Sequence, residues 1–171
     1  MQWSAIIRND RVESITLLAS TPSFVQRANW EHGLQKPVLE QFMSNLEENQ
    51  NTTIRRFIAL QFMGESGTAK LQKQLRAEVA EQQPDTAILN LGLAWLLNCD
   101  YRDRVGQLPP QHWIFGGLDR LIPVSVGSQI EALVPTAKIS YFDECAHAPF
   151  LTQTETITET LLEFIQQLKS K

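Results

Sequence analysis

The stretch HWIFGGLD, from His112 to Asp119, decides how this sequence folds. It begins as an apolar run and ends in two glycines and an aspartate, a pattern typical of a buried strand that stops at a turn. A helical segment, residues 123–135, follows, and then a second apolar run, KISYF from Lys138 to Phe142. Strand, helix and strand in this order make the two strands parallel. The sequence therefore predicts a unit of an α/β sheet.

A third apolar run lies upstream. VESITLLAS, from Val12 to Ser20, has few polar breaks, which favours a strand that is covered on both faces and parallel to its neighbours. Residues 36–97 carry a helical period with no strand pattern, which indicates four helices. These helices are expected to begin at Pro37, at Thr52 or Thr53, before Leu71, and at Asp85.

The order of the elements predicts an α/β fold with three parallel strands, flanking helices and an inserted helical block. Residues 1–23 and 105–171 are expected to form the core, and residues 24–104 the insertion. The last helix is expected to begin at Thr152, because Thr152 and Glu155 have the spacing of a capping box.

The N-terminus raises a separate expectation. Trp3, Ile6 and Ile7 lie on one helical face, yet no capping residue precedes them. The chain is therefore expected either to start inside a helix or to begin with a short, frayed one.

Composition narrows the class of protein. The 171 residues are 43% hydrophobic and 20% charged, which suits one soluble domain with a sizeable core. A net charge of -4 argues against a nucleic-acid partner. No stretch has the pattern of a signal peptide or a membrane span, so no membrane is expected. Cys99 and Cys145 lack metal-ligand spacing, which fits a protein of the reducing cytoplasm.

Two polar side chains follow the strands. Asp119 stands at the end of one predicted strand, and His147 stands just past the end of the next. Parallel neighbouring strands end at the same edge of the sheet, where ligands bind in open α/β folds. The two side chains are therefore expected to meet. A carboxylate on one imidazole nitrogen leaves the other nitrogen free to act as a base.

Each of these residues also has a plainer interpretation. A lone loop histidine is more often a surface or core group, and an aspartate after glycines is often a turn residue. Cys145 is a poor candidate nucleophile for His147, because neighbours on one tight loop seldom face each other. Ser66 lies in GESGT, which reads G-x-S-G and follows no strand.

Several stretches carry a family resemblance. FGGLDRLIP and AHAPF resemble the end of an α/β-hydrolase, in which an aspartate follows one strand and a histidine the next. RVESITLLASTPSF, FIALQFMG and LNLGLAWLLNCDYRDRV narrow the resemblance to the pimeloyl-acyl-carrier-protein methyl ester esterases of biotin synthesis. The resemblance runs over nearly the whole chain and implies the C-terminal portion of an α/β-hydrolase fold.

The resemblance implies roles for individual residues. Asp119 and His147 match the acid and base of a Ser-His-Asp triad, and the helices of residues 24–97 match a lid over the acyl chain. Arg27 and Arg56 match lid arginines that face an acidic acyl-carrier protein, although solvated arginine is the alternative for each. No cofactor and no metal are implied. Three aromatic residues are expected either to line the acyl channel or to form lid core: Phe24, Trp30 and Phe42.

One departure from the family is large. The family carries a serine in a G-x-S-x-G motif before a helix, and this sequence contains no such motif. The partner of His147 is therefore expected to belong to residues outside this chain. The chain alone is expected to have little or no esterase activity. The strand ESITLLA is expected to have an open edge, which favours self-association or a second chain that carries the first half.

Two functions remain open from the sequence. The chain is either the C-terminal part of a serine carboxylesterase, or a non-catalytic module that binds an acyl chain or acyl-carrier protein. A fragment of another α/β-hydrolase is a variant of the first hypothesis, because many chemistries share this fold. An in-frame G-x-S-x-G motif upstream of the coding sequence would favour the enzyme.

Overall fold

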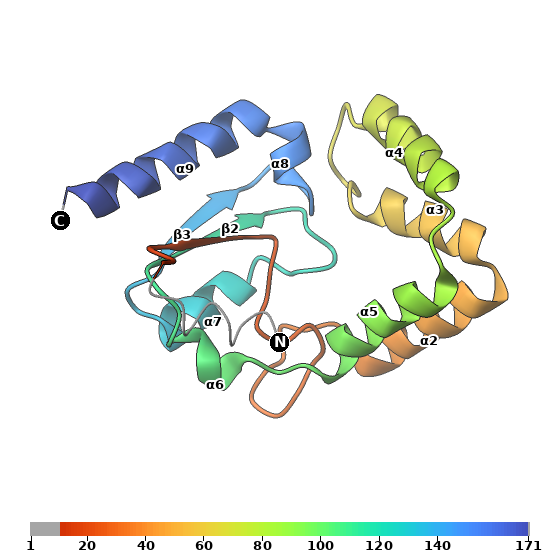
Figure 1. Ribbon diagram of the computed structural model, residues 1–171, viewed down its shortest axis with the longest axis horizontal. Coiled ribbons are helices and arrows are strands. Elements are labelled where there is room, and N and C mark those ends of the chain that lie inside the picture. Colours follow the sequence, from red (N-terminus) through yellow and green to blue (C-terminus); the bar gives the residue numbers. More distant parts are fainter. Residues whose placement is uncertain (1–10, 171) are drawn as a thin grey trace.

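A computed structural model describes residues 11–170 of the chain (Figure 1). Within these residues, β1 (Ile15–Leu18), β2 (Gln111–Gly116) and β3 (Lys138–Phe142) form a parallel sheet in the order β1-β2-β3. Ile15 pairs with Gln111, and His112 pairs with Lys138. The predicted sheet of three parallel strands is confirmed. The expectation about Trp3, Ile6 and Ile7 lies outside the described residues.

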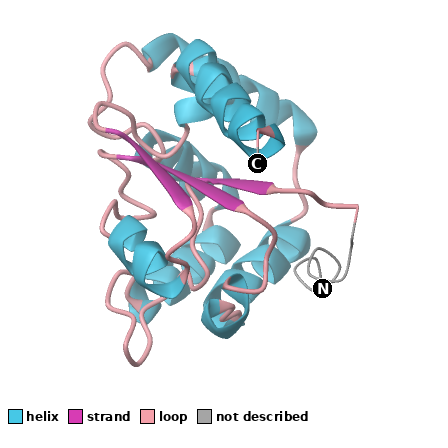
Figure 2. Cartoon of the chain, turned by 90° about the vertical axis from the view of Figure 1, so that its left-hand side faces the viewer, coloured by secondary structure: helices cyan, strands magenta, loops and turns pink. Residues whose placement is uncertain are grey.

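Helices cover both faces of the sheet. Figure 1 shows α9 along one face and α7 on the other, and Figure 2 shows the strands as a layer between helices. Every residue of β2 is buried, as its apolar sequence predicts for the central strand. The helices have these bounds: α2 (Lys36–Glu48), α3 (Gln50–Leu60), α4 (Ala69–Gln82), α5 (Thr86–Asn98), α6 (Arg102–Val105), α7 (Val126–Leu133), α8 (Pro149–Thr152) and α9 (Thr154–Lys169).

The main core lies between the sheet and α7. Trp113 and Phe115, two positions apart on β2, point to the same face and pack in one buried cluster with Val126 and Ile130 of α7. Their rings are stacked at 6.3 Å between centroids. The opposite face of β2 turns His112 toward α9, where its ring lies 5.0 Å from that of Phe164. Because successive side chains of β2 point to opposite faces of the sheet, one set packs against α7 and the other against α9.

The helical block α2–α5 stands to one side of the sheet (Figure 1). It follows β1 in the chain and precedes α6 and β2. The pairing of β1 with β2 therefore joins two strands that the whole block separates in the sequence. A second buried cluster joins the block to the core: Ile58 and Phe62 pack against Ala148, which precedes α8. The block therefore rests on the segment that follows β3. Its extent as a separate unit, residues 24–104, stays a prediction.

The predicted cap of α3 is wrong. Asn49, rather than Thr52 or Thr53, caps this helix, and its Oδ1 accepts a hydrogen bond from the backbone N–H of Thr52 at 3.0 Å. Thr53 lies inside the helix, and its hydroxyl donates to the carbonyl of Asn45. The sequence offers four polar residues with capping ability, Asn49, Asn51, Thr52 and Thr53, and only the bend between α2 and α3 decides among them. The predicted cap at the start of α5 is confirmed, since Asp85 accepts from the N–H of Ala87 at 2.7 Å.

The capping box predicted at Thr152 is also wrong. Pro149 starts the short helix α8, and Thr152 is its last residue, with its hydroxyl at 3.5 Å from the carbonyl of Ala148. Gln153 takes the cap position of α9 without a side-chain bond. A proline at the first helical position begins the helical turn earlier than the capping pattern indicates.

His112 is the most deeply buried titratable group on β2, with no exposed surface. Its Nε2 lies 2.9 Å from the hydroxyl of Ser140 on β3. Burial, assisted by the charge of Lys138, lowers the pKa of His112 to about 4. The unfolded chain therefore binds a proton at mildly acidic pH that the folded chain excludes. This contribution to stability is present above the usual histidine pKa and is lost as the pH falls from about 6.5 to about 4.

A His112→Asn variant tests this dependence. We expect the free energy of unfolding of the parent chain to fall by roughly 2 kcal/mol more than that of the variant between about pH 7 and about pH 5, because only the parent carries the buried imidazole. Urea unfolding at both pH values measures the difference. His32→Asn, in a partly exposed loop, is the matched control and should keep the parent's pH dependence. Equal slopes for the parent and His112→Asn would contradict the prediction.

Candidate active site

Asp119 and His147 meet at the carboxyl edge of the sheet. The Oδ2 atom of Asp119 lies 2.8 Å from Nδ1 of His147. The Asp119 side chain is 1% exposed and that of His147 is 23% exposed. A carboxylate oxygen accepts, so the proton lies on Nδ1 and Nε2 remains as the basic nitrogen. The predicted contact between these two residues is confirmed.

The turn after β2 fixes the orientation of the Asp119 carboxylate. Its Oδ1 accepts hydrogen bonds from the backbone N–H groups of Leu121 at 2.7 Å and Ile122 at 3.0 Å. These two donors and the imidazole leave both carboxylate oxygens satisfied in a buried position. Asp119 is therefore both a turn residue and the partner of His147, and the two interpretations of its sequence position are compatible.

Two glycines allow the aspartate and histidine loops to touch. A Cβ atom on Gly116 would lie 2.0 Å from the carbonyl oxygen of Ala146, and one on Gly117 would lie 2.6 Å from that of Asp143. The backbone N–H of Leu118 donates to the carbonyl of Cys145 at 2.9 Å. Any side chain at positions 116 or 117 would separate the loops, so the two glycines at the end of β2 are required for the contact of Asp119 with His147.

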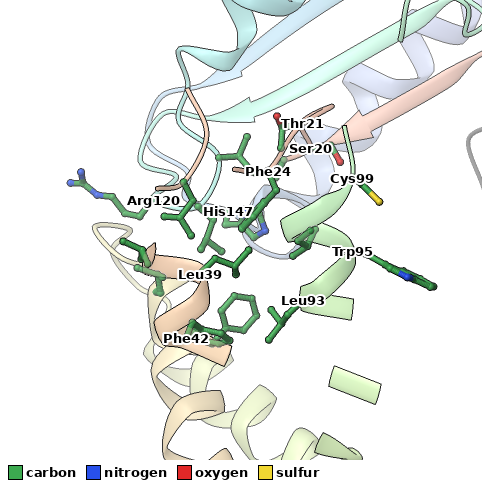
Figure 3. A pocket seen from close by; sticks show the side chains of 18 of the residues that line it. Ser20, Thr21, Phe24, Leu39, Phe42, Leu93, Trp95, Cys99, Arg120 and His147 are labelled. Carbon is green, nitrogen blue, oxygen red and sulfur yellow. The ribbon is translucent and has the colours of Figure 1, made fainter. Parts of the chain in front are cut away.

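His147 lies on the wall of an apolar cavity of about 740 Å³ between the sheet edge and the helical block (Figure 3). The loop after β1 contributes Phe24, α2 contributes Leu39 and Phe42, and α5 contributes Leu93. Because Nδ1 is bonded to Asp119, Nε2 is the nitrogen that remains for a group in this cavity. Polar groups are few on its walls: Ser20, Thr21, Tyr101 and Arg120 besides His147.

The predicted aromatic residues divide between the cavity and the core. Phe24 and Phe42 line the cavity, and the Phe42 ring packs edge-on against Phe57 at 5.6 Å. Of the two alternatives expected for Trp30, channel or core, the structure supports the core. Trp30 is 2% exposed, belongs to the main core cluster, and donates from Nε1 to the carbonyl of Ser23 at 2.9 Å. The loop after β1 turns the Trp30 side chain into the core, and the local sequence carries no pattern that predicts this turn.

The two predicted arginines lie in different environments. Arg27 donates to the carbonyls of Leu97 and Cys99 at 2.9 and 3.2 Å and lies 3.7 Å from Asp100. These contacts connect the loop after β1 to the end of α5. The Arg27 guanidinium thus donates to backbone carbonyls of the same chain. Arg56 is exposed on α3. The structure does not bring the two guanidinium groups together.

Sequence reasoning missed several contributors to the site. Ala19 and Ser20 follow β1 and line the cavity, with Ala19 in the left-handed region at φ 43°. A left-handed alanine has no sequence signal, because this conformation is ordinarily favoured by glycine. Arg120 was adjacent to a predicted site residue and could have been considered on that ground. Glu65 and Gln61, which contact the backbone of the histidine loop, come from the helical block and have no local motif.

Cys145 is unsuited to nucleophilic attack. Burial raises the pKa of its thiol, and the nearby Glu65 carboxylate raises it further. This agrees with the expectation that Cys145 does not act on substrate. Ser66 lies in the turn between α3 and α4, away from any strand, as expected. Among residues 11–170, no group of three or more histidine, cysteine or acidic side chains could hold a metal ion.

Solved structures share the fold of this chain. An esterase from Exiguobacterium antarcticum, a solved structure, matches 96% of this chain with a TM-score of 0.85 at 17% identity. A bromoperoxidase from Bacillus anthracis matches 96% with a TM-score of 0.83 at 18% identity. The chain covers 62% and 63% of these two structures. These matches show that the chain has an α/β-hydrolase fold.

In sequence, the chain resembles proteins named pimeloyl-[acyl-carrier protein] methyl ester esterase. The relative from Vibrio vulnificus (strain CMCP6) is 35% identical over 162 residues, which is 94% of this chain. The relative from Xylella fastidiosa (strain M12) is 36% identical over 162 residues, which is 92% of this chain. The chain spans 63% and 64% of the length of these two relatives. No protein-family model matches the chain.

The helices of residues 11–170 do not have the dimensions of a membrane span. None combines the length and the apolar content that a membrane crossing requires.

An Asp119→Asn variant tests the geometry of the pair without an activity assay. The Oδ1 of asparagine can keep the bonds to Leu121 and Ile122, which turns the amide NH₂ toward Nδ1 of His147. We expect the imidazole proton to move from Nδ1 to Nε2, because Nδ1 must then accept a hydrogen bond. The ¹⁵N chemical shifts of the His147 ring in alkaline buffer measure the tautomer. Asp143→Asn, at an exposed position of the histidine loop, should leave it unchanged.

Proposed function

We propose that the chain is the acid–base and acyl-binding part of a carboxylic ester hydrolase. The observation that carries this proposal is the 2.8 Å contact of Asp119 with Nδ1 of His147 on the wall of an apolar cavity. A base held in one tautomer beside a water-poor cavity is suited to proton transfer on a bound ester. The resemblance to named esterases supports the same chemistry.

In the proposed reaction, an acyl chain occupies the cavity and its ester carbonyl lies near Nε2 of His147. Nε2 takes the proton of an attacking hydroxyl, and the Asp119 carboxylate stabilises the imidazolium that forms. The hydroxyl oxygen bonds to the ester carbon, the bond from that carbon to the alcohol breaks, and the imidazolium gives this proton to the leaving alcohol, which leaves the acyl group on the attacking oxygen. In the second half, His147 activates water in the same way, and the carboxylic acid is released.

The attacking hydroxyl is the part that this chain does not supply in the expected form. No serine of the printed sequence stands in a G-x-S-x-G motif. We propose that residues outside these 171 supply both the nucleophile and donors for the oxyanion. Without them, transition-state stabilisation is lost and the chain alone has background activity.

The proposed substrate is a methyl ester carried by an acyl-carrier protein. The printed name of the relatives states this substrate for them. For this chain, the support is the size and apolar lining of the cavity, which suit a medium-length acyl chain, and the exposed Arg56, which suits an acidic protein surface. A biosynthetic role of this kind, with both cysteines unpaired, fits the reducing cytoplasm.

We further propose that another chain segment covers β1. Within the described residues, β1 pairs on one side only, with β2. The helix α5 also presents an apolar face to solvent, at Ile88, Leu91 and Trp95. An open strand edge and an apolar face both favour association, with a second copy or with a segment that carries the nucleophile.

A chimaera tests the catalytic proposal. The N-terminal part of the Vibrio vulnificus relative that this chain lacks would be joined upstream of the chain. We expect the chimaera to hydrolyse p-nitrophenyl butyrate, and His147→Ala within it to lower kcat by about 10³-fold, because the proton acceptor is gone. The isolated chain should not exceed the His147→Ala background, and it should sediment as a larger species than the chimaera.

Circular dichroism shows whether the chimaera is folded. A folded chimaera whose turnover is unaffected by His147→Ala would end the catalytic proposal. Comparison of pimeloyl methyl ester on acyl-carrier protein with the free methyl ester tests the partner. Equal kcat/KM for the two substrates would remove the carrier protein from the proposal.

The alternative function is a non-catalytic module that binds an acyl chain or its carrier, and the cavity favours it as well. We expect the isolated chain to bind methyl octanoate, and Phe42→Ala to weaken binding about tenfold, because an aromatic wall of the cavity is lost. NMR titration measures the affinity. Leu162→Ala, at an exposed site on α9, is the control. Binding without turnover in the folded chimaera would favour the module over the enzyme.

A further inference from the structure

We propose that Glu65, in the turn between α3 and α4, is a positioning residue for His147. The inference rests on the proposed function, in which His147 is the base. Glu65 does not touch the reacting atoms. It holds the backbone from which the imidazole projects, and it does so from the helical block rather than from the sheet.

The contact is direct and spans a large part of the chain. The Oε2 atom of Glu65 accepts a hydrogen bond from the backbone N–H of Ala146 at 2.8 Å. The next residue along the loop is held by the same turn, because the N–H of His147 donates to the carbonyl of Gln61 at 3.0 Å. Two consecutive donors of the histidine loop are thus taken by residues 61–65.

The sheet side holds the loop at a different residue. The N–H of Cys145 donates to the carbonyl of Phe142 at 3.0 Å, and the carbonyl of Cys145 accepts from Leu118 at 2.9 Å. The core therefore fixes position 145, while the helical block fixes positions 146 and 147. The bonds from Glu65 and Gln61 lie at and next to the Cα of His147. They therefore set the position from which the His147 side chain reaches Asp119.

Among residues 11–170, the side chain that accepts from the backbone N–H of Ala146 is that of Glu65. Ala146 and Ala148 are each 1% exposed, and neither side chain carries a polar group. The carboxylate is the stronger form of acceptor for a backbone N–H. Gly64, at φ 90°, permits the turn and rests against Leu118, which adjoins Asp119. The turn of the helical block thus borders both loops of the acid–base pair.

A consequence for the reaction follows. If the turn shifts, the imidazole loses its alignment with Asp119 and with a bound ester, although the cavity walls remain. Loss of Glu65 should therefore lower kcat more than it changes KM. The acceptor matters rather than the charge, so a glutamine at this position should preserve the function.

NMR of the isolated chain tests the contact without reference to activity. In Glu65→Ala, we expect amide exchange of Ala146 to be at least tenfold faster and the low-field Nδ1–H signal of His147 to broaden beyond detection. Glu65→Gln should retain both signals, because its amide oxygen still accepts. Glu65→Asp keeps the charge with a shorter reach and should behave as Glu65→Ala. Glu81→Ala, a matched change in the same helical block, should behave as the parent.

The outcomes separate the two proposals. Unchanged Ala146 and His147 signals in Glu65→Ala, or in Glu65→Asp if the alanine variant does not fold, would overturn the role of Glu65. In the chimaera, Glu65→Ala should lower kcat 10- to 100-fold with KM within about twofold, and Glu65→Gln should restore kcat. A chimaera whose turnover is independent of His147 would end the proposed function, whereas the NMR result would still decide the Glu65 contact. A rise in KM alone would overturn the positioning role.

Discussion

The bond between Asp119 and His147 requires two loops from different strands to touch at backbone distance. Gly116 and Gly117 permit this approach, and the parallel pairing of β2 with β3 brings both loops to one edge. The carboxylate is buried with three donors around its two oxygens, so its direction is set by the fold and not by the imidazole alone. The rest of the site is arranged around this fixed pair.

The helical block α2–α5 contributes to the site of Asp119 and His147 in two ways. Its helices α2, α3 and α5 supply apolar walls of the cavity that His147 faces, and its turn at residues 61–65 binds the backbone of the histidine loop. The buried contact of Ile58 and Phe62 with Ala148 fastens the two parts together. The proposed acyl binding and the proposed alignment of the base therefore depend on the same segment, and a rearrangement that alters one would alter the other.

The solved structures that share this fold have different chemistries. An esterase and a bromoperoxidase match the fold almost equally well, with TM-scores of 0.85 and 0.83. A fold shared by different chemistries does not select one. The proposal of ester hydrolysis rests on the apolar cavity beside the Asp119-bound imidazole, together with named esterases at 35% and 36% sequence identity.

The sequence by itself determined the three parallel strands, the Asp85 cap and the meeting of Asp119 with His147. These features follow from local periodicity and from the rule that joins strand, helix and strand, so neighbouring residues contain the information. Only the tertiary structure decided that Trp30 is core, that Asn49 caps α3, and that Glu65 holds the histidine loop. Such contacts depend on where a loop or turn lies in space, and the residues that meet there are 81 positions apart in the case of Glu65 and Ala146.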